Sequence, residues 1–153
     1  MRTKRMTRRD SRILALCALF CWHVGKMDPD ESFDLLASEA RQEFMADSGN
    51  IEYARELVGT TVSRVQEIDA AIDQVSQGWP VSRMPRVDLL IIRLAYAEGL
   101  IVKGAPMEVV LDEAIELSKE YSSHASPKFV NGVLMGLFRK MGWSGDSAKR
   151  YNI

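Results

Sequence analysis

The sequence predicts an all-α fold of six or seven helices in one compact domain over residues 1–153. Apolar residues recur at three- and four-residue steps along every segment, which is the period of an amphipathic helix. No segment alternates apolar and polar residues in the way a half-buried strand does. Proline sits just after a good N-cap residue at Asp28-Pro29 and Ser126-Pro127, which is typical of a helix start. The break at residues 76–86 is the expected division of the domain into two helical halves.

The first helix is expected from about Thr7 to Val24 and has two halves of opposite character. Residues 1–12 carry six basic residues and one acid, whereas residues 13–24 carry no charge when His23 is neutral. The helical period places one set of apolar residues on a buried face: Ile13, Leu16, Cys17, Phe20 and Val24.

The next two helices follow from their start signals. Asp28-Pro29 begins a helix that is expected to end near Met45. Asn50 can cap a third helix, whose apolar pattern continues to Ile72 across a bend expected at residues 67–69.

The second half of the chain is expected to contain three longer helices. Residues 87–102 are the most apolar segment, and hydrophobic side chains surround this helix, which predicts a central position buried on most sides. Two further helices are expected over residues 106–121 and 126–142. Residues 1–6 and 143–153 are expected to be flexible.

The formal net charge of −1 hides a basic arm on a mildly acidic body. Residues 1–12 sum to +5, which leaves −6 for the rest of the chain. Cations crowded at a helix N-terminus are unfavourable by themselves, and phosphates would satisfy both the guanidinium groups and the helix dipole. Nucleic acid is therefore the favoured partner. A solvated basic tail and an acidic protein or membrane surface remain open as alternatives.

Few residue patterns in the sequence indicate catalysis or metal binding. Cys17 and Cys21 lie one helical turn apart without a CxxC pair, which favours small buried hydrophobes in a reducing compartment. Glu113, Glu116 and Glu120 share one helix face, where a solvated acidic surface is the simpler interpretation. No nucleophile has a base beside it, and no glycine-rich phosphate loop follows a strand. We expect no enzyme, no cofactor and no metal.

The location is expected to be cytoplasmic. No apolar run reaches the length that spans a membrane. The basic-then-apolar start superficially matches a secretory signal peptide, but residues 13–24 are followed by no small-residue cleavage site.

Residues 112–134 resemble the C-terminal signature of the NusB family of bacterial transcription antitermination factors. They read DEAIELSKEY, a short loop, and then SPKFVNGVL. The stretch from Arg12 to Trp22 is similar to the first helix of the family, and the stretch from Val87 to Glu98 is similar to its central helix. The resemblance covers nearly the whole chain.

The resemblance implies a NusB-like bundle in two packed halves and a role without catalysis. Family members bind the boxA element of ribosomal RNA leaders together with the ribosomal protein NusE, and then act on RNA polymerase with other Nus factors. Both monomers and dimers occur in the family, so a homodimer is a further candidate assembly.

The resemblance also implies site residues. Six basic residues are the expected RNA contacts: Lys4, Arg5, Arg8, Arg9, Arg12 and Lys128. Asp88 occupies the acidic position at the start of the central helix, which implies contact with NusE. A purely structural role as a carboxylate at a helix N-terminus is equally expected for Asp88.

Two other functions are compatible with these residues. The chain could be a helical protein-interaction module that binds no RNA. It could also act in trans with a ribosomal RNA methyltransferase, because NusB-like domains occur attached to such enzymes. The sequence contains no strand-glycine segment for S-adenosylmethionine.

Overall fold

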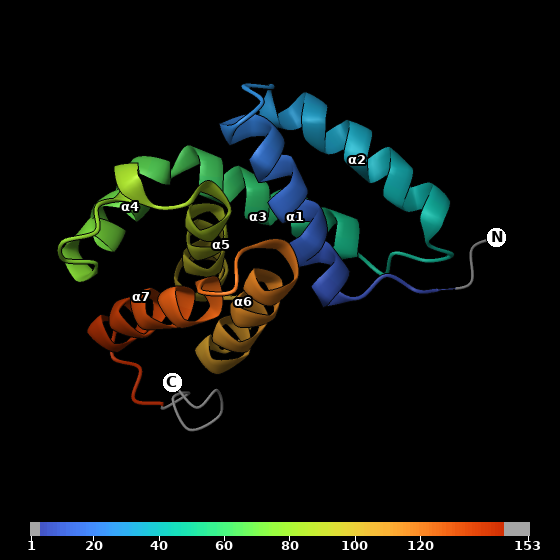
Figure 1. Cartoon of the computed structure of the whole chain (residues 1–153). Coiled ribbons are helices and arrows are strands. Elements are labelled where there is room, and N and C mark those ends of the chain that lie inside the picture. Colours follow the sequence, from blue (N-terminus) through green and yellow to red (C-terminus); the bar gives the residue numbers. More distant parts are fainter. Residues whose placement is uncertain (1–3, 146–153) are drawn as a thin grey trace. The chain divides into compact units, whose positions relative to one another are not determined.

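The computed structural model describes residues 4–145 and forms an all-α fold there (Figure 1). The described residues contain seven α-helices, one short 3-10 helix and one π-helical segment. In chain order these are α1 Arg8–His23, α2 Pro29–Glu43, α3 Asn50–Ser63, α4 Val65–Val75, η1 Val81–Arg83, α5 Arg86–Tyr96, η2 Ala97–Val102, α6 Met107–Tyr121 and α7 Ser126–Lys140. The predicted fold class is confirmed.

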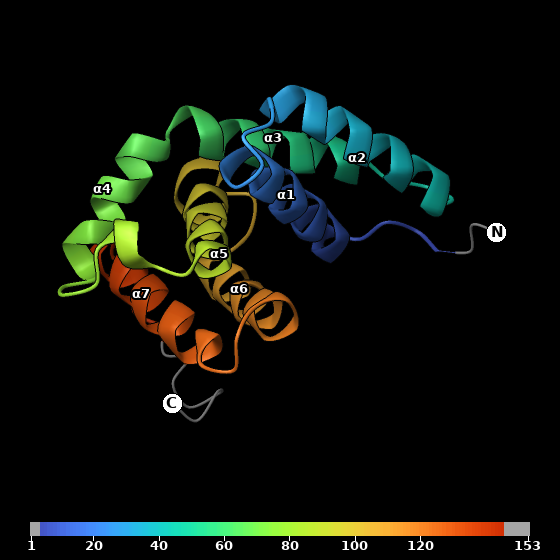
Figure 2. The same ribbon diagram turned by 45° about the horizontal axis from the view of Figure 1, so that its top comes forward.

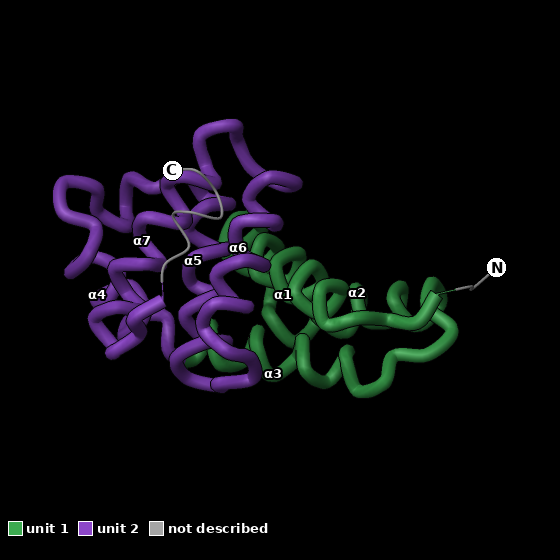
Figure 3. Tube along the Cα trace, turned by 90° about the horizontal axis from the view of Figure 1, so that it is seen from below, with its two compact units in different colours: residues 1–63 green, residues 64–153 purple. Residues whose placement is uncertain are grey.

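The chain forms two compact units, Met1–Ser63 and Arg64–Ile153, which Figure 3 colours separately. The division falls between α3 and α4, where Arg64 leaves the helical conformation, and not at the expected break of residues 76–86. The reason is packing: α4 contacts α5 and α7, so the connection at residues 76–86, which includes η1, lies inside the second unit.

In the first unit, α1 packs against α2 and α3. The predicted buried face of α1 is only partly correct: Leu16 is buried and Ile13 and Val24 are half-buried, whereas Cys17 is exposed and 41% of Phe20 is accessible to solvent. The buried apolar residues of this helix are Leu14, Ala15, Leu16, Ala18 and Leu19. Residues 13–24 are apolar on almost every side, so the helical period of the sequence could not show which face of α1 is buried.

Residues 4–6, which we expected to be flexible, are bonded to the loop that follows α2. The Met45 amide donates to the Lys4 carbonyl at 2.9 Å, and the Met6 amide donates to the Ala46 carbonyl at 2.8 Å. Met6 is 3% exposed, so its side chain anchors the segment in the core. The remaining part of that prediction, residues 1–3, lies outside the described residues.

In the second unit, α5 contacts α4, α6 and α7 (Figure 2). Every residue from Asp88 to Leu100 is buried, which agrees with the predicted central helix. The helix widens at η2, where a Cβ on Gly99 would lie 3.3 Å from the Phe138 ring. The lack of a side chain at Gly99 permits this close approach.

The central helix buries charged groups, and two of them have clear partners. Arg93 donates to both carboxylate oxygens of Asp69, at 2.8 and 2.7 Å. The Ser122 hydroxyl donates to the Asp88 carboxylate. Such partners are needed because an unpaired buried charge is strongly destabilising.

The end of the described chain is also held in place. Trp143, part of the segment expected to be flexible, packs edge-on against Phe138 and donates its indole N–H to Glu108 at 3.1 Å. Residues 146–153 of that segment lie outside the described residues. Among the helices of residues 4–145, none combines the length and the apolar character that crossing a membrane requires.

Candidate nucleic-acid interface

The start of α1 lies within the basic run because Thr7 and Asp10 form a capping box. The Thr7 hydroxyl oxygen accepts from the Asp10 amide at 3.2 Å, and the Asp10 carboxylate accepts from the Thr7 amide at 2.8 Å. Asp10 is the only acid in residues 1–12, and it places a negative charge in the first turn, where the helix dipole favours one. The sequence signal for this start was present as a Thr three residues before an acid.

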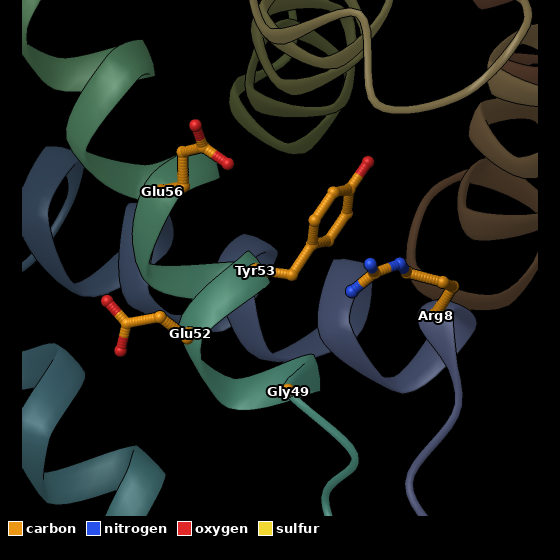
Figure 4. A pocket seen from close by; sticks show the side chains of 5 residues that line it. All are labelled: Arg8, Gly49, Glu52, Tyr53 and Glu56. Atoms are coloured by element: carbon orange, nitrogen blue, oxygen red, sulfur yellow. The ribbon is translucent and has the colours of Figure 1, made fainter.

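Arg8 is held by two neutral groups from α3. Its guanidinium carbon lies 3.6 Å from the centre of the Tyr53 ring (Figure 4). Its Nη1 donates to the Asn50 side-chain oxygen at 2.8 Å. Asn50 is fixed in turn, because its side-chain amide donates to the Met6 carbonyl at 2.7 Å. Arg8 remains exposed to solvent.

The other predicted cations of the first unit divide into exposed and buried groups. Lys4, Arg5 and Arg9 are exposed, and the backbone of the first two is held by the contacts to the loop after α2. Arg12 is only 5% exposed. This burial differs from the expected surface contact, and it arises because Arg12 lies on the inward face of α1 beside Ser11 and Ala15.

Lys128 belongs to the second unit, where it is exposed in the first turn of α7. The neighbouring Phe129 is half-buried and packs against Trp79 with ring centres 6.1 Å apart. Trp79 is 48% exposed. This aromatic pair beside a lysine was not anticipated, because its two members are fifty positions apart in the sequence.

Asp88 lies in the first turn of α5 and is 2% exposed. Its bond from Ser122 continues into a hydroxyl network, since Ser126 donates to Ser122 at 2.9 Å. The geometry suits the structural role that the sequence allowed for this carboxylate. Contact with a protein partner stays a prediction.

A pocket of about 430 Å³ opens beside the Arg8–Tyr53 pair (Figure 4). It is lined by Arg8, Gly49, Glu52, Tyr53 and Glu56. Gly49 precedes α3 with φ of +79°, in the left-handed region that favours glycine. Sequence reasoning identified only Arg8, because Tyr53 fits the apolar stripe of α3 and nothing in the pattern places it beside α1.

Comparison with known proteins assigns the family. The family model described as "NusB family" matches residues 9–139. The chain belongs to the NusB family. It is 41% identical to the transcription antitermination protein NusB of Desulforamulus reducens over 129 residues, which cover 84% of this chain and 87% of that relative.

Solved structures agree with this assignment. The fold is similar to T. maritima NusB, with a TM-score of 0.79 and 31% identity, over 92% of this chain and 94% of that one. A chain from a crystal structure of the antitermination factors NusB and NusE in complex with dsRNA has a TM-score of 0.78 and 28% identity, covering 87% and 96% of the two chains. The predicted family resemblance is confirmed.

The relatives are transcription antitermination proteins and not enzymes. Cys17 reaches the surface, but its thiol is partly enclosed, and this burial, followed by the nearby Cys21, raises the pKa of the thiol. A raised pKa reduces the fraction of reactive thiolate. Within residues 4–145, no three potential metal-ligating side chains gather into a group.

Proposed function

We propose that this NusB-family protein is a transcription antitermination factor that binds boxA-type RNA of ribosomal RNA operons together with the ribosomal protein NusE. The observation that carries the proposal is the set of exposed cations at the start of α1, on a fold similar to a chain solved with NusE and dsRNA. The same assembly would include other Nus factors and RNA polymerase in the cytoplasm.

The backbone contacts of the arm support RNA binding. Lys4 and Arg5 lie on a segment that is tied to the loop after α2, and Arg8 is positioned by Tyr53 and Asn50. A cation that is already in place loses less conformational entropy when it meets a phosphate. These residues, with Arg9, would therefore grip the RNA backbone, while sequence is read through the bases.

The partners of Arg8 leave its charge uncompensated. An aromatic ring and an amide oxygen orient the guanidinium without neutralising it. One of its five N–H donors is used by Asn50, and the remaining donors suit phosphate oxygens. Lys128 would add a phosphate contact from the second unit, and Asp88 stays a proposed NusE contact whose competing role is structural.

The test is a double charge reversal, Arg8→Glu with Arg9→Glu, measured by fluorescence anisotropy on a boxA RNA with and without NusE. We expect RNA affinity to fall by about a hundredfold, because two phosphate contacts become repulsive. The matched control is Arg139→Glu with Lys140→Glu, two exposed cations at the end of α7, which should change affinity much less. Circular dichroism should show the same helical content in both variants.

The salt dependence gives a second measurement in the same experiment. The single change Arg9→Gln should lower the slope of log affinity against log salt by about 0.7 if Arg9 contacts one phosphate of single-stranded RNA. Unchanged affinity in the double variant, or NusE binding without any RNA binding by the wild type, would refute the RNA role. Sizing the protein alone and with both ligands separates a homodimer from the heterodimer.

A further inference from the structure

We propose that the pocket beside Arg8 and Tyr53 holds one unpaired nucleobase of the RNA, with guanine preferred, and that Glu56 reads its edge. This inference rests on the proposed RNA binding and adds the base and the residues that recognise it. Three features carry it: a stacked guanidinium, an acidic rim and a carboxylate without a partner among the described residues.

The guanidinium of Arg8 forms a preorganised flat platform. One face lies 3.6 Å from the Tyr53 ring centre, and the bond from Nη1 to Asn50 fixes its orientation. Arg8 is exposed and lines the pocket, and we assign its face away from Tyr53 to the base. Splayed bases of single-stranded RNA stack on arginine guanidinium planes as well as on aromatic rings.

The rim of the pocket disfavours a phosphate. Glu52 and Glu56 contribute two carboxylates against the single guanidinium, so the lining groups have a net negative charge. A carboxylate accepts hydrogen bonds and donates none, so it attracts the N–H groups on a base edge and repels an anion. The phosphates would then lie outside the pocket, against the N–H edge of the Arg8 guanidinium and toward Arg9 and the arm, while the face of Arg8 receives the base.

Glu56 is the carboxylate that is available for a base. Glu52 lies 3.5 Å from the Arg55 Nε and is partly engaged by it. Glu56 is exposed and makes no hydrogen bond or ion pair with any described residue. In Figure 4 its side chain leaves α3 on the same side as the Tyr53 ring.

Guanine fits this arrangement best among the four bases. Its Watson–Crick edge presents the N1–H and the N2 amino group side by side, so both oxygens of one carboxylate can accept in parallel. Adenine and cytosine offer an amino group beside an acceptor, and uracil offers one imino N–H between two acceptors. Each of those bases would leave part of the carboxylate unsatisfied or facing an oxygen or ring nitrogen.

The test compares a short uridine oligomer that carries one guanosine with the same oligomer carrying inosine, which lacks only the N2 amino group. For the wild-type protein we expect the guanosine oligomer to bind about tenfold more tightly, the effect of one charge-assisted hydrogen bond. Glu56→Gln should abolish this difference. Glu39→Gln, which removes the same charge from an exposed position on α2, should retain it.

The sign of the Glu56→Gln effect discriminates between reading a base and merely lying near the RNA. If Glu56 only repels the backbone, removing its charge strengthens binding to both oligomers equally, and the inference is overturned. If Glu56 reads guanine, binding to the guanosine oligomer weakens. The platform is tested with Tyr53→Phe, which keeps the stack and the preference, against Tyr53→Leu, which removes the ring and should lose it.

Failure of this inference is distinct from failure of the proposed function. A wild-type protein that binds boxA RNA but shows equal affinity for guanosine and inosine oligomers overturns the pocket and leaves the RNA role intact. A wild-type protein that binds no RNA at all overturns both.

Discussion

The two units of this protein handle arginine in opposite ways. In the second unit, Arg93 is buried in the central helix and forms a fork with the carboxylate of Asp69. In the first unit, Arg8 is exposed and is held by an aromatic ring and a neutral amide. The carboxylate cancels the charge of Arg93, whereas the partners of Arg8 orient a charge that they do not cancel. A paired arginine fixes a helix in place, and an oriented but uncompensated one is prepared for an anion or a stacked base.

The largest expected effect comes from breaking the buried pair. Arg93→Ala should lower the free energy of unfolding by about 3 kcal/mol, because it leaves the Asp69 carboxylate without its partner in a partly buried site. Urea unfolding followed by circular dichroism measures this. The matched change Arg55→Ala, which removes an exposed pair with Asp34, should cost less than about 1 kcal/mol in pairing energy. Equal losses would remove the contrast between buried and exposed arginines.

A smaller effect is expected from Asp88→Ala, which decides between the two roles of this carboxylate. If Asp88 is structural, loss of the Ser122 bond and of a negative charge in the first turn of α5 should cost about 2 kcal/mol of stability. NusE affinity should then stay the same. The control Asp30→Ala removes an exposed acid from the first turn of α2 and should cost less than about 1 kcal/mol. Normal stability with weakened NusE binding would instead establish Asp88 as a partner contact.

The smallest expected effect concerns the N-terminal cap of α1 in the first unit. Thr7→Ala removes one half of the capping box and should lower stability by about 1 kcal/mol. Thr7→Ser keeps the hydroxyl and should restore nearly all of it, as thermal unfolding will show. Because Thr7 only fixes where α1 begins, RNA affinity measured well below the melting temperature should change by less than about twofold. A large loss of RNA affinity in the folded Thr7→Ala variant would mean that the cap itself takes part in binding.

Much of the fold could be predicted because the residues that begin a helix and give it its apolar period lie close together in the sequence. The Asp28-Pro29 start and the apolar segment of residues 87–102 correspond to observed elements, and α7 begins at Ser126, although Ala125 and not Ser126 is its N-cap. The face of α1 could not be predicted, since a helix that is apolar on almost every side has no preferred orientation until its neighbours are present. The predicted division between the units was wrong for the same reason. No glycine or proline marks the boundary at Arg64, and only the packing of α4 against α5 and α7 shows where it lies.

The candidate nucleic-acid interface shows the same limit of prediction from the sequence. The sequence indicated which cations matter, because a basic run at the start of a helix is a local pattern. It could not separate exposed Arg8 from buried Arg12, which lie one turn apart on the same helix. It also gave no indication of the Tyr53 stack or of the Asn50 bond.

By itself, then, the amino-acid sequence determined the helical class, the helix starts, the basic arm and the resemblance to the NusB family, all of which depend on residues close together along the chain. The tertiary structure decided which arginine is buried, which one is stacked, and which carboxylates surround the pocket. The physical reason is that burial and orientation depend on residues more than forty positions away, such as Asn50 for Arg8, and these meet only when the helices pack.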